Sequence, residues 1–117
     1  ESFAIWDEAG EYGITAHEMA ASVDTGTIVA VSRFALPDMP DLYNVGDLIY
    51  SKAVEVFATV AAHCATSDAP MPPAGVDWHQ RRYTKADSRE LCRSGSQHQG
   101  TALDRLKRAC GKDFIEP

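Results

Sequence analysis

The segment from residue 41 to residue 64 constrains the fold of this chain more than any other part of the sequence. Apolar residues recur there at helical spacing on one side, and mostly polar residues fall on the other. The apolar positions are Val45, Ile49, Ala53, Val56, Val60 and Cys64. This periodicity predicts a long amphipathic helix over about 42–64. Because its apolar arc is broad, we expect the helix to lie at the centre of the core or to pack partly against a second subunit.

The segments before this helix are shorter and carry conflicting signals. Ser2 can cap a first helical turn, and Thr15 to Glu18 forms a capping box that predicts a second helix, ending before Gly26. Residues 27–36 contain a β-branched cluster that favours a short β segment. No second convincing strand is evident to pair with it, and we therefore favour a helix there.

Residues 68–80 separate the long helix from the C-terminal part. Three prolines and a glycine in this stretch exclude regular structure and predict an internal loop. After it, Thr84 and Thr101 each precede an aspartate by three residues, and each begins a predicted short helix. We therefore expect one mainly α domain over residues 1–117, a compact bundle of about five or six helices around the long one.

The net charge of −6 is unevenly distributed along the chain. Residues 1–75 carry 11 acidic and two basic side chains, whereas residues 76–117 carry nine basic and six acidic ones. This split can steer a charged partner or favour head-to-tail self-association, unless the two halves neutralise each other within one fold. No apolar run approaches the roughly 20 residues that span a bilayer, so no membrane span is expected.

The three cysteines and four histidines have a spacing that fits no zinc-binding pattern, so no metal or other cofactor is expected. An antiparallel pair of C-terminal helices could bring Cys92 and Cys110 within disulfide-bonding distance, leaving Cys64 beside His63. Three reduced cysteines in a cytoplasmic protein are the alternative. Because the chain begins at Glu1 without an initiator Met, we slightly favour an exported protein, periplasmic or secreted.

The candidate binding residues follow the proline-rich loop. Two aromatic residues, a histidine and two arginines stand close together there. They are Trp78, His79, Arg81, Arg82 and Tyr83. Trp, Tyr and Arg carry much of the binding energy in protein interfaces, and they can also stack on bases and contact phosphate. We predict that this cluster binds another protein; the alternative is that Trp78 lies in the core and the arginines pair with the acidic N-terminal half.

Residues 8–23 have the outline of a helix–turn–helix, with Gly13 at the turn and Ile14 and Met19 at apolar positions. The second helix of this motif would carry no Lys or Arg and would carry Glu18, which phosphates repel. A DNA-binding regulator is therefore an alternative that the charge disfavours, and nucleic acid is not the expected partner.

Residues 8–14, followed by Ser32, Arg33 and Phe34, resemble the opening of lysozyme-like lytic transglycosylases, in which a Tyr-Gly-Ile turn precedes a helix ending in Glu-Ser-Arg-Phe. Here Val31 stands where that family has its catalytic glutamate, the helix spacing is too long, and the family's Gly-Leu-Met-Gln segment is missing. Without this carboxylic acid the glycosidic oxygen has no proton donor. The resemblance implies a cell-wall-associated relative that lacks catalytic activity and has a helix around Val31.

No acid–base pair, metal-binding set or phosphate-binding loop stands out in the sequence, so we lean against an enzyme. The charge asymmetry and the cluster from Trp78 to Tyr83 instead indicate a non-catalytic protein-interaction module, such as an adaptor, an accessory protein or an inhibitor-like partner binder. Its expected partner is another protein or a second copy of the chain, which would make a dimer.

Overall fold

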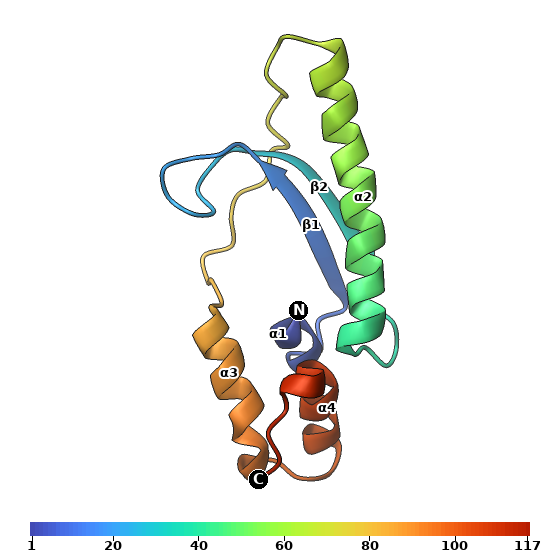
Figure 1. Cartoon of the computed structure of the whole chain (residues 1–117), viewed down its shortest axis with the longest axis vertical. Helices are drawn as coiled ribbons and strands as arrows, with labels where there is room; N and C mark the ends of the chain where they lie inside the picture. The colour runs from blue at the N-terminus through green and yellow to red at the C-terminus, as the bar shows by residue number, and fades with distance from the viewer. The chain divides into compact units, whose positions relative to one another are not determined.

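The computed structural model describes residues 1–117 and contains four α-helices, two short 3₁₀-helices and a two-stranded antiparallel sheet (Figure 1). The elements in chain order are α1 Ser2–Trp6, β1 Glu11–His17, β2 Ile28–Ala35, α2 Leu42–Thr66, α3 Lys85–Arg93, η1 Ser94–Gln97, α4 Gly100–Cys110 and η2 Gly111–Asp113. Helices hold 49% of the residues and strands 13%. The prediction of a bundle of five or six helices is therefore wrong.

The helix predicted from the capping box at Thr15 to Glu18 is absent, because its residues form the end of β1 and the loop that follows it. Side chains alternate between exposed and half-buried along most of β1, which is the period-two pattern of a strand. β2 begins at Ile28 with the β-branched cluster and pairs with β1. The helix favoured for residues 27–36 is therefore wrong, and the short β segment is what forms. Each strand supplies the partner that the other needs, so pairing outweighs the local capping signal of Thr15 and Glu18.

The residues cluster into two compact units. Unit 1 comprises Glu1–Tyr12, Ala35–Asp47 and Arg81–Pro117, and unit 2 comprises Gly13–Phe34 and Leu48–Gln80. The three elements β1, β2 and α2 each contribute residues to both units.

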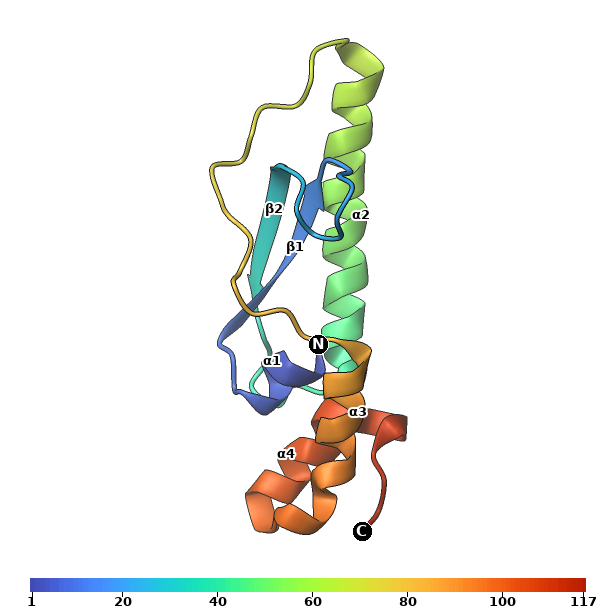
Figure 2. The same ribbon diagram turned by 90° about the vertical axis from the view of Figure 1, so that its left-hand side faces the viewer.

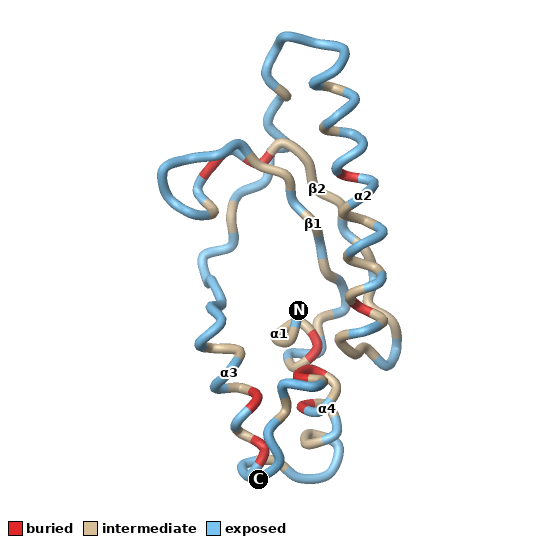
Figure 3. Tube along the Cα trace, in the orientation of Figure 1, coloured by how far each residue is buried: buried red, intermediate tan, exposed pale blue.

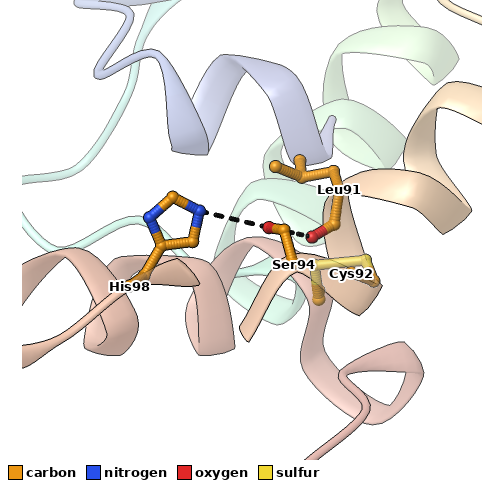
Figure 4. Close-up of a disulfide and its surroundings, with 5 residues drawn as sticks. Leu91, Cys92, Ser94 and His98 are labelled. Carbon is orange, nitrogen blue, oxygen red and sulfur yellow. Dashed lines mark hydrogen bonds between the residues drawn. A yellow bond between two sulfur atoms is a disulfide. The ribbon is translucent and has the colours of Figure 1, made fainter. Parts of the chain in front are cut away.

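Unit 1 holds most of the buried apolar side chains. α1 and α3 both pack against α4, and Ile5, Leu106 and Ala109 are almost fully buried. A disulfide joins Cys92 of α3 to Cys110 of α4, with the two Cα atoms 5.6 Å apart (Figure 4). The cysteine pair expected from the sequence is thus present in the structure, and the third cysteine is exposed on α2.

The start of α3 agrees with the sequence prediction. The amide of Asp87 donates to the hydroxyl of Thr84 at 3.2 Å, and the Asp87 carboxylate accepts from the amide of Thr84 at 2.6 Å, which completes a capping box. The backbone hydrogen bond from Thr84, followed by the one from its hydroxyl, lowers the pKa of Asp87, because both stabilise the charged carboxylate.

α2 is one helix of 25 residues and lies close to the span predicted from the sequence. Asp41 precedes it, and its carboxylate accepts from the amides of Tyr43 and Asn44, both at 2.8 Å, as an N-cap residue does. The helix is not the centre of a bundle. Only Val45 and Val56 are buried along its length, and most of its surface is exposed (Figure 3).

Judged by length and composition alone, α2 could cross a membrane. Core helices of soluble proteins and signal sequences can have the same length and apolar composition, so these two properties are weak evidence for a span. We assign no membrane span to the chain on this basis.

Residues 67–84, which include the proline-rich stretch 68–80, contain no helix or strand. Within unit 2 this segment returns from the end of α2 toward the sheet (Figure 2). The amide of Ala74 donates to the carbonyl of Ile28 at 2.8 Å, so the segment is fastened to the start of β2.

Candidate functional site

The loop between β1 and β2 is closed by hydrogen bonds within unit 2. The amide of Glu18 donates to the carbonyl of Thr27 at 2.9 Å, and the hydroxyl of Thr25 donates to the carbonyl of Ser22 at 2.8 Å. Between them Asp24 has a φ of +53°, a left-handed conformation that costs energy for a residue with a side chain. The closed loop therefore holds the Asp24 backbone in a conformation that it would rarely adopt alone.

Only glycine fits at position 26 of this loop. A Cβ atom on Gly26 would overlap the carbonyl oxygen of Glu18. The carbonyl of Gly26 accepts a hydrogen bond from the indole N–H of Trp78 at 2.8 Å. Because Trp78 lies in the proline-rich segment, this bond fastens that segment to the loop.

His17, the last residue of β1, faces the carboxylate of Asp24. Its Nδ1 lies 2.8 Å from the carbonyl oxygen of Glu18, and since a carbonyl only accepts, Nδ1 carries a hydrogen. Its Nε2 lies 3.9 Å from Oδ1 of Asp24. The imidazole also meets the Trp78 ring at 78°, with 4.8 Å between ring centroids. The orientation of His17 is thus fixed from two sides, and Nε2 and the Asp24 carboxylate form a polar pair.

A surface cavity of about 450 Å³ in unit 2 has His17 in its wall. Glu18 lines it beside His17, and α2 contributes His63 and Cys64. His63 Nε2 donates to the carbonyl of Ala69 at 2.7 Å, which orients this second imidazole. Pockets of this size bind small organic molecules in other proteins. No group of three or more His, Cys, Asp or Glu side chains is arranged to hold a metal ion.

Comparison with known proteins finds a match in structure. No protein family matches the sequence, and no curated protein does. A crystal structure of a variant of HypX from Aquifex aeolicus has a TM-score of 0.71 to this chain at 18% identity, over 95% of the chain. The fold is similar to part of HypX. A second HypX variant and a HypX complex with tetrahydrofolic acid each give a TM-score of 0.68 at 19% identity.

The chain spans about a fifth of the length of the HypX chains that it matches. At this sequence identity the likeness to HypX shows the fold alone. The two strands of this chain contradict the helices on which the lytic transglycosylase and helix–turn–helix alternatives depend. Val31 lies in β2, so the helix implied by the lytic transglycosylase resemblance is absent. Residues 11–17 form β1, so the helix–turn–helix expected over residues 8–23 is absent as well.

The predicted partner-binding cluster is divided between the units. The cluster residues are Trp78 and His79 in unit 2 and Arg81, Arg82 and Tyr83 in unit 1. Trp78 is half-buried and bound to the β1–β2 loop. Tyr83 stacks on Phe3 with 3.9 Å between ring centroids, and the Arg81 guanidinium lies 4.7 Å from the Tyr83 ring. Both aromatic side chains therefore have internal contacts, and partner binding by this cluster stays a prediction.

The pair of His17 and Asp24 was missed by the sequence analysis. The capping-box assignment placed His17 on a helix and left Asp24 near its end. The available signal was Asp24-Thr25-Gly26 between a run of alternating character and a β-branched run, which is typical of a turn between two strands.

Proposed function

We propose that this chain contributes the β1–β2 loop to a binding site for a tetrahydrofolate-class ligand. The observation that carries the proposal is the polar pair of His17 and Asp24, which the loop holds in one geometry with His17 in the wall of the cavity. The choice of ligand class is supported by the likeness to HypX, which has been crystallised in complex with tetrahydrofolic acid.

The hydrogen-bonding groups of tetrahydrofolic acid are compatible with those of His17 and Asp24. Tetrahydrofolic acid carries a pterin with several N–H donors, and a carboxylate such as that of Asp24 makes charge-assisted hydrogen bonds to donors of this kind. The imidazole of His17, with a hydrogen on Nδ1, presents Nε2 as an acceptor when neutral and as a donor when protonated. The loop holds these groups before the ligand arrives, which reduces the entropy lost on binding.

Calorimetric titration of the chain with tetrahydrofolic acid under anaerobic conditions tests this proposal. We expect saturable binding that weakens about 10- to 100-fold in Asp24→Asn, because hydrogen bonds to charged groups contribute about 1.5–3 kcal/mol. The matched control is Asp38→Asn, the same charge change at an exposed position of unit 1. Absence of saturable binding, or equal weakening in both variants, contradicts the proposal.

A second candidate function is self-association, and the exposed side of α2 supports it. Three apolar side chains of α2 are largely exposed: Tyr50 is 75%, Val54 50% and Phe57 73% exposed. They are spaced by four and three residues, and Ala61 and Cys64 continue the same spacing. This is the heptad pattern of a coiled-coil seam. Such a seam is complementary to itself, so we assign a second copy of α2 as its occupant.

Light scattering over a concentration series tests self-association. We expect a dimer that dissociates in the double variant Tyr50→Glu/Phe57→Glu and persists in the control Thr59→Glu/Thr66→Glu, whose exposed positions lie outside the seam. In a parallel dimer, mild oxidation should also link Cys64 to Cys64 of the second copy. A wild-type chain that stays monomeric contradicts this candidate, and sedimentation with phosphatidylcholine vesicles would identify lipid as the occupant instead.

A further inference from the structure

A second cavity, of about 800 Å³, lies entirely within unit 1. Phe3 and Trp6 of α1 line one part of it, and Arg89 and Arg93 of α3 line another. His98, which follows η1, also lines the cavity. The cavity shares no residue with the β1–β2 loop, so what it binds is a separate question from the proposed folate site.

The aromatic wall of this cavity is held by its neighbours. The Trp6 and His98 rings are 4.7 Å apart between centroids, and the Arg105 guanidinium lies 5.0 Å from the Trp6 ring. The hydroxyl of Ser94 donates to the carbonyl of Leu91 at 2.7 Å, so it can only accept from Nε2 of His98, which is 3.2 Å away (Figure 4). The rings therefore have fixed positions before a ligand binds.

Two arginines and two acids line the cavity, so its charged side chains balance in number. Arg89 and Arg93 are one helical turn apart on α3, both are exposed, and neither forms an ion pair. Of the two acids in the lining, Asp87 is engaged by the amide and hydroxyl of Thr84. Glu90 is the other acid. The hydrogen bonds to Asp87 come from neutral donors and leave its charge in place, so the two acids balance the two arginines. A guanidinium group matches a carboxylate in a planar, bidentate geometry.

We propose that this cavity binds a small aromatic carboxylate, with its ring against Trp6 and its carboxylate on Arg89 and Arg93. Because the lining carries two acids as well as two arginines, a monoanion fits it better than a phosphate that carries two charges. The flat ring of the ligand matches the aromatic wall, because offset-stacked and edge-to-face contacts between aromatic rings are favourable.

Calorimetric titration of the full chain with benzoate, alongside cyclohexanecarboxylate, tests this proposal. We expect saturable benzoate binding at one site and at least tenfold weaker binding of cyclohexanecarboxylate, which has the same charge but no flat ring. Arg89→Gln/Arg93→Gln should weaken benzoate binding at least tenfold with an unchanged melting temperature. The matched control is Lys85→Gln/Lys112→Gln, which removes two exposed positive charges from unit 1 outside the cavity lining.

The emission of Trp6 gives an independent readout of the same binding. The chain has two tryptophans, so Trp78→Phe leaves Trp6 as the only one, and benzoate should shift or quench its emission along the calorimetric curve. The proposal is overturned if benzoate does not saturate, if both double variants weaken binding equally, or if Trp6 emission does not respond. Equal affinity for cyclohexanecarboxylate would overturn the aromatic specificity.

Discussion

Gly26 approaches the carbonyl oxygen of Glu18 so closely that no side chain fits between them. The same carbonyl oxygen is the acceptor for Nδ1 of His17. One backbone atom thus requires glycine at position 26 and also orients the His17 imidazole that faces Asp24.

Gly26→Ala should therefore damage both the fold of the loop and the proposed ligand site. We expect the free energy of unfolding to fall by about 1–3 kcal/mol, as for other overpacked sites, and tetrahydrofolate binding to weaken in parallel. Urea unfolding followed by circular dichroism measures the first effect. Gly10→Ala is the control, because a Cβ on Gly10 meets no atom within 4 Å. Equal stability of the two variants would show that the loop can rearrange.

Loss of the disulfide should destabilise unit 1. Cys92 and Cys110 are 18 residues apart in sequence, and closing a loop of this length contributes about 3 kcal/mol in the chain-entropy account. We expect Cys92→Ser/Cys110→Ser to unfold at lower urea concentration than the wild type, with Cys64→Ser close to neutral because this cysteine is exposed. Mass spectrometry should show a gain of two hydrogens on reduction. An unchanged mass would mean that the pair is not oxidised in the purified protein.

The capping box of α3 should make part of the stability depend on pH. The folded state lowers the pKa of Asp87 below its ordinary value of 3.8. The resulting stabilisation is present above that ordinary value and is lost as the pH falls through the lower pKa of the folded state. Asp87→Asn should remove this acid-dependent part of the melting curve. Thr84→Ala should cost about 1 kcal/mol at neutral pH.

Melting temperatures measured between neutral pH and about pH 3 check this dependence. Glu90→Gln, which removes an exposed acid of the same helix outside the capping box, serves as the control. If Asp87→Asn and Glu90→Gln change the pH dependence equally, the capping box is not its source.

The core of unit 1 should be sensitive to loss of volume at Leu106. This side chain is fully buried, and removing most of it creates a cavity. We expect Leu106→Ala to lower the free energy of unfolding by about 2–5 kcal/mol. Ile115→Ala should cost much less, because Ile115 is 51% exposed. Similar losses for the two variants in urea unfolding would contradict the burial of Leu106.

The features that could be predicted from the sequence depend on residues close together in the chain. The long helix follows from a periodicity of apolar residues, and its observed bounds, Leu42–Thr66, lie near the predicted ones. The start of α3 follows from Thr84 and Asp87, three residues apart. In each case the signal and the structure involve the same few residues, so no distant partner was needed.

The features that could not be predicted depend on distant partners. Thr15 in β1 and Glu18 just after it match the sequence pattern of a capping box, but the pairing of β1 with β2 makes this segment a strand. The arrangement of His17 beside Asp24 depends on that pairing and on the left-handed turn, so the wrong assignment of β1 concealed the site. Periodicity shows which side of α2 is apolar, but it does not show what covers that side.

Neither unit is a continuous stretch of sequence. The backbone passes from one unit to the other after Tyr12, Phe34, Asp47 and Gln80. A truncation after Gln80 would therefore delete α3 and α4 and leave Ile5 of α1 without the helix against which α1 packs. Gene fragments cut at any one of these four points should yield insoluble or protease-sensitive products, so the function of each unit has to be studied by point substitution in the whole chain.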